Sequence, residues 1–182
     1  MKLIVTTSRE PSRRTRSFVK DLTSTINGLI KISRGKRTLK DLLNIVHSYD
    51  CKGVLMVLER AGNPSALSYY VERDGNLDRM FLIKLSSIKL IREISGAQRP
   101  SSPCKPVVDN ASIEGDIPTD VVDVIKTVLN AANGLDTRNA GEAVRLKFKH
   151  AGTYVSLTFE CVASGRICGP ELRILKVVSN AI

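Results

Sequence analysis

The first half of the chain alternates short apolar runs with segments in which apolar residues recur at helical spacing. Residues 3–6 are mostly apolar and β-prone, which predicts an opening strand. From Arg13 to Ile26, apolar side chains return every three or four positions, and Asn27-Gly28 is typical of a helix end. We therefore expect one strand followed by one helix before residue 29.

The pattern continues with alternating elements as far as residue 85. Residues 29–33 predict a second strand, and Thr38 follows as a candidate N-cap of a second helix. Residues 53–59 form a nearly continuous apolar run, which is typical of a central strand covered on both faces. Two further strands are expected at 66–71 and 80–85.

Glycine, proline and serine gather at residues 96–106. This composition predicts a long surface connection rather than a helix or strand. The connection divides a single domain of residues 1–182 into an N-terminal half at 1–95 and a C-terminal half at 107–182.

The C-terminal half predicts one helix followed by strands. Thr119 or Asp120 is the expected N-cap of a broadly apolar helix that ends near Asn133-Gly134. Both halves thus mix helices with β-hairpins, which predicts an α/β (α+β) fold of two similar lobes with mixed sheets and packed helices. The three strands expected after the helix lie at 143–148, 154–162 and 172–178.

The composition, with 42% hydrophobic and 25% charged residues, is that of an ordinary globular protein. No run of residues approaches the ~20 apolar positions that a membrane helix requires. The opening apolar run is also shorter than the roughly 7 to 15 residues of a secretory signal. We therefore expect a cytoplasmic protein.

Cys51, Cys104, Cys161 and Cys168 could form two disulfides or one metal site with four thiolates. Zinc sites usually pair their ligands about two to four residues apart, and no two of these cysteines are that close. With no secretion signal, we expect buried free thiols.

The net charge of +10 is distributed unevenly along the chain. Residues 1–50 contain 11 basic and 4 acidic side chains, residues 51–100 contain 8 and 5, and residues 101–182 contain 9 and 9. All the excess positive charge therefore lies in the first hundred residues. Such an excess is usually neutralised by a polyanion, of which nucleic acid is the commonest.

Four arginines within eight residues lie at the predicted junction between the first strand and the first helix. A helix N-terminus carries partial positive charge, so arginines in the first turn oppose the dipole by roughly 0.3 to 1 kcal/mol each. Unpaired backbone N–H groups, guanidinium groups and hydroxyl groups would together surround a phosphate. The residues of this predicted RNA-binding cluster are Ser8, Arg9, Ser12, Arg13, Arg14, Thr15, Arg16 and Lys20.

A second basic stretch contains no acidic residue and surrounds a turn that could lie beside the first cluster. Two clusters in one half favour an extended surface that follows RNA phosphates. The alternative is a solvated basic surface on which Ser8 or Ser12 serves only as a helix cap. The residues predicted to bind RNA in this stretch are Lys31, Arg34, Lys36, Arg37 and Lys40.

Residues 4–22, with the sequence IVTTSREPSRRTRSFVKDL, closely resemble the opening signature of the Brix-domain family, especially its small-subunit processome branch. Residues 60–67 resemble the strand and turn of that family that end in a glycine-x-proline step. Residues 169–173 resemble its late glycine-proline-arginine signature. The resemblance extends from about Leu3 to about Val178.

Two positions depart from the family pattern. The family has arginine directly after the late glycine-proline pair, whereas this chain has Glu171, with Arg173 as a possible substitute for the RNA contact. The glycine-proline-threonine segment of eukaryotic relatives is replaced by residues 73–76. The chain is similar to a minimal archaeal version of the family, without long charged tails.

The resemblance implies a ribosome biogenesis factor. Its implied partners are precursor rRNA, or guide RNA paired with it, together with other pre-ribosomal proteins. It would assist rRNA processing and subunit assembly without catalysis. The resemblance also implies two halves that each resemble the anticodon-binding domain of class II aminoacyl-tRNA synthetases.

The residues themselves predict no catalytic, cofactor or metal site. His47 and His150 are expected at structural or exposed positions, and the acidic residues are scattered rather than clustered for a metal. Residues 8–12 contain no glycine, which excludes the usual phosphate-binding loops. We therefore expect that the protein is not an enzyme and binds no small-molecule substrate.

The chain has no tryptophan and 4% aromatic residues, so base stacking should contribute little. We expect Tyr69, Tyr70 and Phe81 in the core and RNA recognition through phosphates and shape. The alternative function is a protein-interaction scaffold within a pre-ribosomal particle, whose basic half only neutralises neighbouring RNA. Direct binding through phosphates would weaken steeply with salt, whereas a scaffold would keep its protein partner.

Overall fold

The computed structural model describes residues 2–134 and 141–180. The predicted order of elements in the N-terminal half is confirmed, although β4 and β5 are longer than expected and β2 is shorter. These elements are β1 (Lys2–Thr7), α1 (Arg13–Thr25), β2 (Leu29–Lys31), α2 (Leu39–Ser48), β3 (Cys51–Arg60), β4 (Asn63–Arg73) and β5 (Asn76–Lys89).

The C-terminal half contains the predicted helix and three strands, together with short elements that the pattern did not predict. The predicted elements are α3 (Thr119–Leu129), β9 (Ala143–Ala151), β10 (Tyr154–Cys161) and β12 (Glu171–Ser179). The additional ones are β6 (Lys105–Val108), η2 (Asn110–Ser112), β7 (Ile113–Glu114), β8 (Ala132–Asn133) and β11 (Arg166–Ile167), and a further short helix, η1 (Ile91–Glu93), lies at the end of the N-terminal half.

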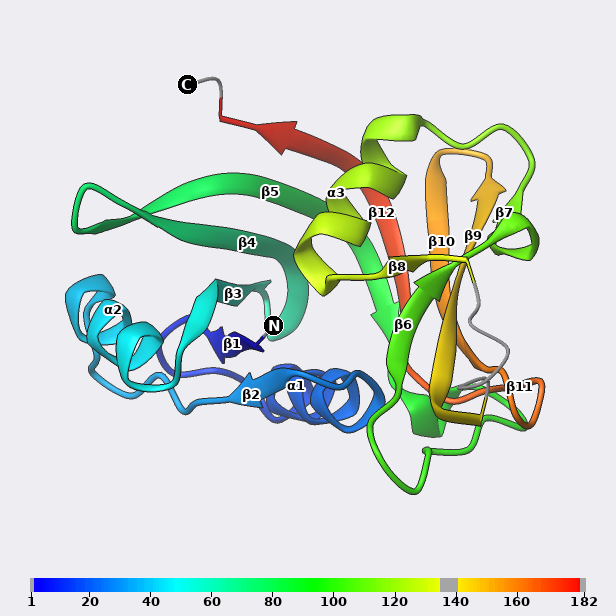
Figure 1. Ribbon diagram of the computed structural model, residues 1–182, viewed down its shortest axis with the longest axis horizontal. Coiled ribbons are helices and arrows are strands. Elements are labelled where there is room, and N and C mark those ends of the chain that lie inside the picture. The colour runs from blue at the N-terminus through cyan, green and yellow to red at the C-terminus, as the bar shows by residue number, and fades with distance from the viewer. Residues whose placement is uncertain (1, 135–140, 181–182) are drawn as a thin grey trace.

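Within the described residues, all twelve strands belong to one mixed sheet. The main path runs β2-β1-β3-β4-β5-β12-β10-β9-β6-β8, so the sheet passes from one half to the other where β5 pairs antiparallel with β12. Figure 1 shows this joint, with β12 in red beside β5 and the two halves on either side.

The two halves repeat the same strand order. Outward from the joint, the first two strand pairs of each half are antiparallel and the next two are parallel. The order is β5-β4-β3-β1-β2 in one half and β12-β10-β9-β6-β8 in the other. Helix α1 connects β1 to β2, and α3 lies between β6 and β8 in the chain. The topology is therefore repeated, while the likeness of each half to an anticodon-binding domain stays a prediction.

Strand β3 is covered on both faces, as its continuous apolar run predicted. Leu55 and Val57 belong to the apolar cluster that contains Phe18 of α1. Val54 belongs to a second cluster, which contains Leu42 of α2. Because successive side chains of a strand point to opposite faces, the two helices cover opposite sides of the sheet.

The helix caps agree with the sequence for α2 and differ for α3. Thr38 caps α2 in a capping box with Asp41, whose carboxylate accepts hydrogen bonds from the Thr38 N–H and hydroxyl groups, both at 2.8 Å. The predicted cap of α3 is wrong, because the chain enters that helix from Pro118 without a side-chain cap. The helix also ends earlier than expected, where Asn130 adopts the left-handed conformation with φ of 53°.

The segment 96–106, predicted as a surface connection, is mostly exposed, and its end is fixed to α1 by hydrogen bonds. The Cys104 N–H donates to the Thr25 carbonyl at 2.8 Å, and the Asn27 N–H donates to the Cys104 carbonyl at 2.8 Å. Arg99 also pairs with Asp21, a buried carboxylate of α1. The connection ends inside β6, so it forms part of the contact between the halves.

The buried and exposed positions of the aromatic side chains agree with the prediction in part. Tyr69 is buried and stacks on the half-buried ring of Phe81, with ring centroids 6.2 Å apart. Tyr70 is half-buried against the cluster beneath α2.

Among the described residues, no helix combines the length and apolar character needed to span a membrane.

The expectation of four free thiols is wrong for two of them. Cys161 and Cys168 form a disulfide, with Cα atoms 5.7 Å apart. The chain turns back after β10, and β11 pairs with it, which brings two cysteines seven positions apart within bonding distance. Cys51 and Cys104 are free, and of the two Cys104 is buried.

Removing this disulfide with Cys161→Ala/Cys168→Ala should lower the free energy of unfolding by about 2 to 3 kcal/mol, because a short closed loop no longer restricts the unfolded chain. Urea denaturation of the oxidised protein measures the change. Cys51→Ala, at a half-buried free thiol, is the control and should change stability much less. Equal stability of oxidised wild type and the double variant would contradict the predicted contribution of the disulfide.

Candidate nucleic-acid interface

The carboxyl ends of three parallel strands meet at one edge of the sheet. Val5 of β1 pairs with Lys31 of β2, and Thr7 pairs with Val57 of β3. Beyond the strands, the Ser8 N–H donates to the Val57 carbonyl at 2.9 Å. The two basic segments that follow β1 and β2 therefore begin side by side, as the second turn was expected to do.

Most of the predicted RNA-binding cations are exposed at this edge and along α1. Within residues 2–134 and 141–180, none of these exposed cations forms an ion pair. We call this set the basic surface, and it consists of Arg9, Arg13, Arg16, Lys20, Lys31, Lys36, Arg37 and Lys40.

Three cations of the basic surface form a row along α1. Arg13, Arg16 and Lys20 occupy positions i, i+3 and i+7, which lie on one side of a helix. At a rise of about 1.5 Å per residue, the row spans about 10 Å. Their charges are therefore placed close enough to act on one polyanion.

Arg14 differs from these neighbours because it has protein partners. Its Nη1 and Nη2 atoms both pair with the Glu93 carboxylate, the second at 2.8 Å, and Nη2 also donates to the Ile88 carbonyl at 3.0 Å. The hydrogen bond from Arg14 lowers the pKa of the Glu93 carboxyl group. Arg14 thus connects α1 to η1, and its predicted contact with RNA stays a prediction.

The N-terminus of α1 is already occupied by a carboxylate. Glu59 Oε2 accepts hydrogen bonds from the Ser12 N–H at 3.0 Å and from the Thr15 hydroxyl group at 2.6 Å. The Ser12 hydroxyl group accepts from the Thr15 N–H at 3.1 Å and donates to the Gly62 carbonyl at 2.8 Å. Ser12 and Thr15 were predicted to bind phosphate, and the structure instead gives both to Glu59 and the turn after it.

Sequence reasoning missed Glu59 because it stands alone in an apolar strand, without a local acidic motif. Its role depends on the pairing of β3 with β1, which carries the end of β3 to the start of α1. Hydrogen bonds from Thr15 and Ser12 lower the pKa of the Glu59 carboxyl group. A negative charge here also favours the helix dipole.

Arg34 is the second exception among the predicted residues. It is 8% exposed, and its Nε and Nη1 atoms are buried without a hydrogen-bond partner in the described residues. Ser8, by contrast, is half-buried at the start of the loop after β1. The structure therefore separates the predicted residues into exposed, paired and buried groups.

A hollow of about 320 Å³ opens beside α1. Lys20 contributes to it, and so do Arg92 of η1 and Arg99, which the sequence analysis did not single out. Arg99 is paired with Asp21. No local pattern marks these two arginines, because the packing of the chain after β5 against α1 brings them there. The remaining lining residues are Ser17, Asp21 and Leu90.

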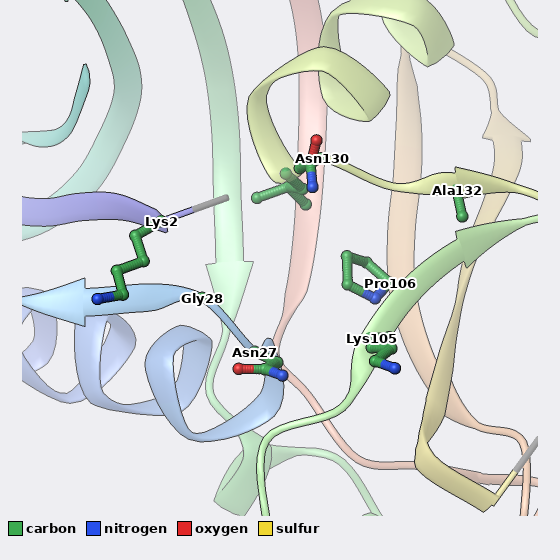
Figure 2. Close-up of a pocket in the computed structure, with 8 residues that line it drawn as sticks. Lys2, Asn27, Gly28, Lys105, Pro106, Asn130 and Ala132 are labelled. Carbon is green, nitrogen blue, oxygen red and sulfur yellow. The ribbon is translucent and has the colours of Figure 1, made fainter. Parts of the chain in front are cut away.

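A second hollow of about 380 Å³ lies between the two halves, at the opposite, amino-terminal end of β1. Figure 2 shows Lys2 and Asn27 on one side and Lys105 and Pro106 of β6 on the other. None of its eight lining residues is an acid, a histidine or a cysteine, so this hollow offers no acid–base pair. The others are Gly28, Leu129, Asn130 and Ala132.

Neither histidine belongs to either hollow. His47 is exposed and lies 2.7 Å from the Glu72 carboxylate, and His150 is exposed at the end of β9. Among the described residues, no group of three or more acidic, histidine or cysteine side chains is arranged to hold a metal ion. The expectations of no catalysis, metal or cofactor stay predictions.

Glu171 and Arg173, at the departure from the late family motif, pair with each other through Arg173 Nε at 2.9 Å. Glu171 also pairs with Lys89 of β5 at 3.1 Å, and Arg173 lies over the Tyr154 ring. Both residues therefore take part in the pairing of β12 with β5.

Glu59→Gln should lower the free energy of unfolding at pH 7 by about 1 to 2 kcal/mol, because hydrogen bonds to a charged acceptor are the stronger ones. The lowered pKa of Glu59 means that its contribution is present above the ordinary value of 4.5 and is lost as the pH falls through the folded-state pKa. Urea denaturation of wild type and variant from pH 7 to pH 3 should therefore show a difference that shrinks with acid. Glu10→Gln, at an exposed loop position, is the control, and a Glu59→Gln difference that does not depend on pH would be inconsistent with this assignment.

The chain is similar in sequence to archaeal proteins that share one description. The chain matches no model of a known protein family. It is 35% identical over 140 residues to a probable Brix domain-containing ribosomal biogenesis protein of Pyrobaculum aerophilum, covering 74% of this chain and 76% of the relative. A protein of the same description from Methanothermobacter thermautotrophicus is 45% identical over 74 residues, which is 40% of this chain and 44% of that protein.

Two solved structures share the fold. The crystal structure of a probable ribosomal biogenesis protein from Aeropyrum pernix matches with a TM-score of 0.84 at 27% identity, over 96% of both chains. The structure of Mil, an archaeal Imp4-like protein, matches with a TM-score of 0.68 at 23% identity, over 98% of this chain and 99% of that one. On the extent of the sequence match to the Pyrobaculum protein, this chain belongs to the family of Brix domain-containing ribosomal biogenesis proteins.

Proposed function

We propose that this protein is a ribosome biogenesis factor that binds precursor rRNA, or rRNA paired with a guide RNA, through its basic surface. It would assist rRNA processing and subunit assembly in the cytoplasm, beside other pre-ribosomal proteins and without catalysis or a cofactor. The names of its relatives support the biological process. The basic surface supports RNA as the binding partner.

The observation that carries this proposal is the set of eight exposed cations that have no ion-pair partner among the described residues. They come from two segments that are separate in sequence and that parallel strand pairing brings to one edge. Like charges held together repel one another, and phosphates that replace condensed counterions relieve this repulsion. RNA offers such phosphates at regular spacing.

The mode of recognition follows from the side chains that are present. Tyr69 is buried, and Phe81 is partly covered, so neither ring presents a free stacking face to a base. Among the described residues, five large hydrophobic side chains are exposed, and one of them is aromatic. This residue is Tyr49, which follows α2 and is 46% exposed. Recognition would therefore depend mainly on phosphate positions and on RNA shape.

Arg13→Gln/Arg16→Gln/Lys20→Gln should weaken binding to precursor rRNA fragments and lower the slope of log affinity against log salt by about 2 to 3, close to one per lost phosphate contact. Fluorescence anisotropy with labelled RNA over a sodium chloride series measures both quantities. Arg14 is left unchanged because it is paired with Glu93. Circular dichroism confirms that the variant is folded.

The matched control is Lys105→Gln/Arg166→Gln/Lys176→Gln, which removes the same charge from exposed positions of β6, β11 and β12. This control should retain most of the affinity and nearly the full salt slope. Equal losses in the two triple variants would show that net charge alone matters. Absence of RNA binding by a wild-type protein that still enters pre-ribosomal particles would favour the protein-scaffold function instead.

A further inference from the structure

Arg34 is held in an unusual environment for an arginine. It lies in the turn between β2 and α2, keeps 8% exposure, and has two buried guanidinium nitrogens without a hydrogen-bond partner in the described residues. Arginine is almost never fully buried unless it is paired. An unpaired buried charge is costly, so the site is incomplete as it stands.

The neighbouring groups do not satisfy this guanidinium. Burial, and then the like charge of Arg9, lower the pKa of Arg34, while Tyr70 and Asp41 act in the opposite direction. The Asp41 carboxylate is already committed, because it accepts both hydrogen bonds of the Thr38 cap. The nearby negative charge thus holds α2 in place and is not hydrogen-bonded to Arg34.

The turn that carries Arg34 is itself well held. The Arg37 N–H donates to the Arg34 carbonyl at 3.1 Å, and Arg37 Nη1 donates to the Ser33 carbonyl at 2.7 Å. The backbone of this turn is therefore restrained by hydrogen bonds.

We propose that Arg34 is the receptor for one phosphodiester group of the bound RNA, with Arg9 as the second cation, since the two arginines follow the paired ends of β1 and β2. This inference rests on the proposed function and adds to it a single buried contact within an otherwise exposed surface. The two buried nitrogens, Nε and Nη1, would turn outward to donate to a phosphate oxygen, and the anion would neutralise the like charges of Arg9 and Arg34. The buried contact would set the register of the RNA, while the exposed cations add affinity that depends on salt.

The first test compares Arg34→Met with Lys36→Met, an exposed cation of the same turn. Arg34→Met should lower RNA affinity by about ten- to a hundredfold, as expected for loss of a charged hydrogen-bonded contact, and Lys36→Met by much less. Arg34→Lys should recover only a part, because an ammonium group cannot reproduce the fork. Equal effects of Arg34→Met and Lys36→Met would overturn the proposal while leaving RNA binding by the basic surface intact.

The second test separates ligand binding from a structural role by thermal denaturation without RNA. Inorganic phosphate should raise the Tm of wild type above that in chloride of equal ionic strength and should leave that of Arg34→Met unchanged. Without phosphate, Arg34→Met should be as stable as wild type or more so, because an unpaired charge has been removed. A large loss of stability together with no response of wild type to phosphate would show that Arg34 is structural and would overturn the proposal.

The two tests also distinguish the source of the phosphate. If wild type responds to inorganic phosphate through Arg34 but binds no RNA, the anion site stands as a site for free phosphate, and both the proposed function and its RNA phosphodiester are rejected. If RNA binds through Arg13, Arg16 and Lys20 but not through Arg34, the proposed function stands and the buried receptor is rejected.

Discussion

Parallel pairing of β1 with both β2 and β3 is the constraint on which the rest of the N-terminal half depends. Parallel strands end at the same edge, so the segments that leave them must turn there together. This arrangement makes neighbours of two basic stretches that are separate in sequence. It also carries Glu59 to the first turn of α1, where its carboxylate completes the cap. Both the fold and the candidate interface therefore originate in one set of backbone hydrogen bonds.

Arginines that are similar in sequence acquire different roles at this edge. Arg13 and Arg16 remain exposed, Arg14 forms a bidentate pair with Glu93, and Arg34 is buried without a partner. The differences come from what each side chain meets after packing, since a guanidinium beside a carboxylate is a structural contact and one beside solvent is available to a ligand. The same residue type thus serves to stabilise the helix and to form the surface beside it.

The repeated strand order does not carry a repeated distribution of charge. In the C-terminal half, Arg145 pairs with Asp109 and Glu160, and Lys149 pairs with Glu114. These internal pairs match the balanced composition of residues 101–182. The halves share a sheet through β5 and β12, yet the unpaired cations of the basic surface lie in the N-terminal half. The same topology thus supports a surface of unpaired cations in one half and a set of internal ion pairs in the other.

The sequence by itself determined the order of the main elements, the double coverage of β3, the cap of α2 and the concentration of charge, because hydrophobic period, capping chemistry and composition are local properties. It missed β6, β8 and the disulfide, since short strands and a cysteine pair are defined by distant partners. It assigned Ser12 and Thr15 to a phosphate, and in the structure both donate hydrogen bonds to Glu59. Tertiary structure decided which cations stay free, which are paired and which one is buried, because electrostatic environment depends on neighbours in space and not on spacing along the chain.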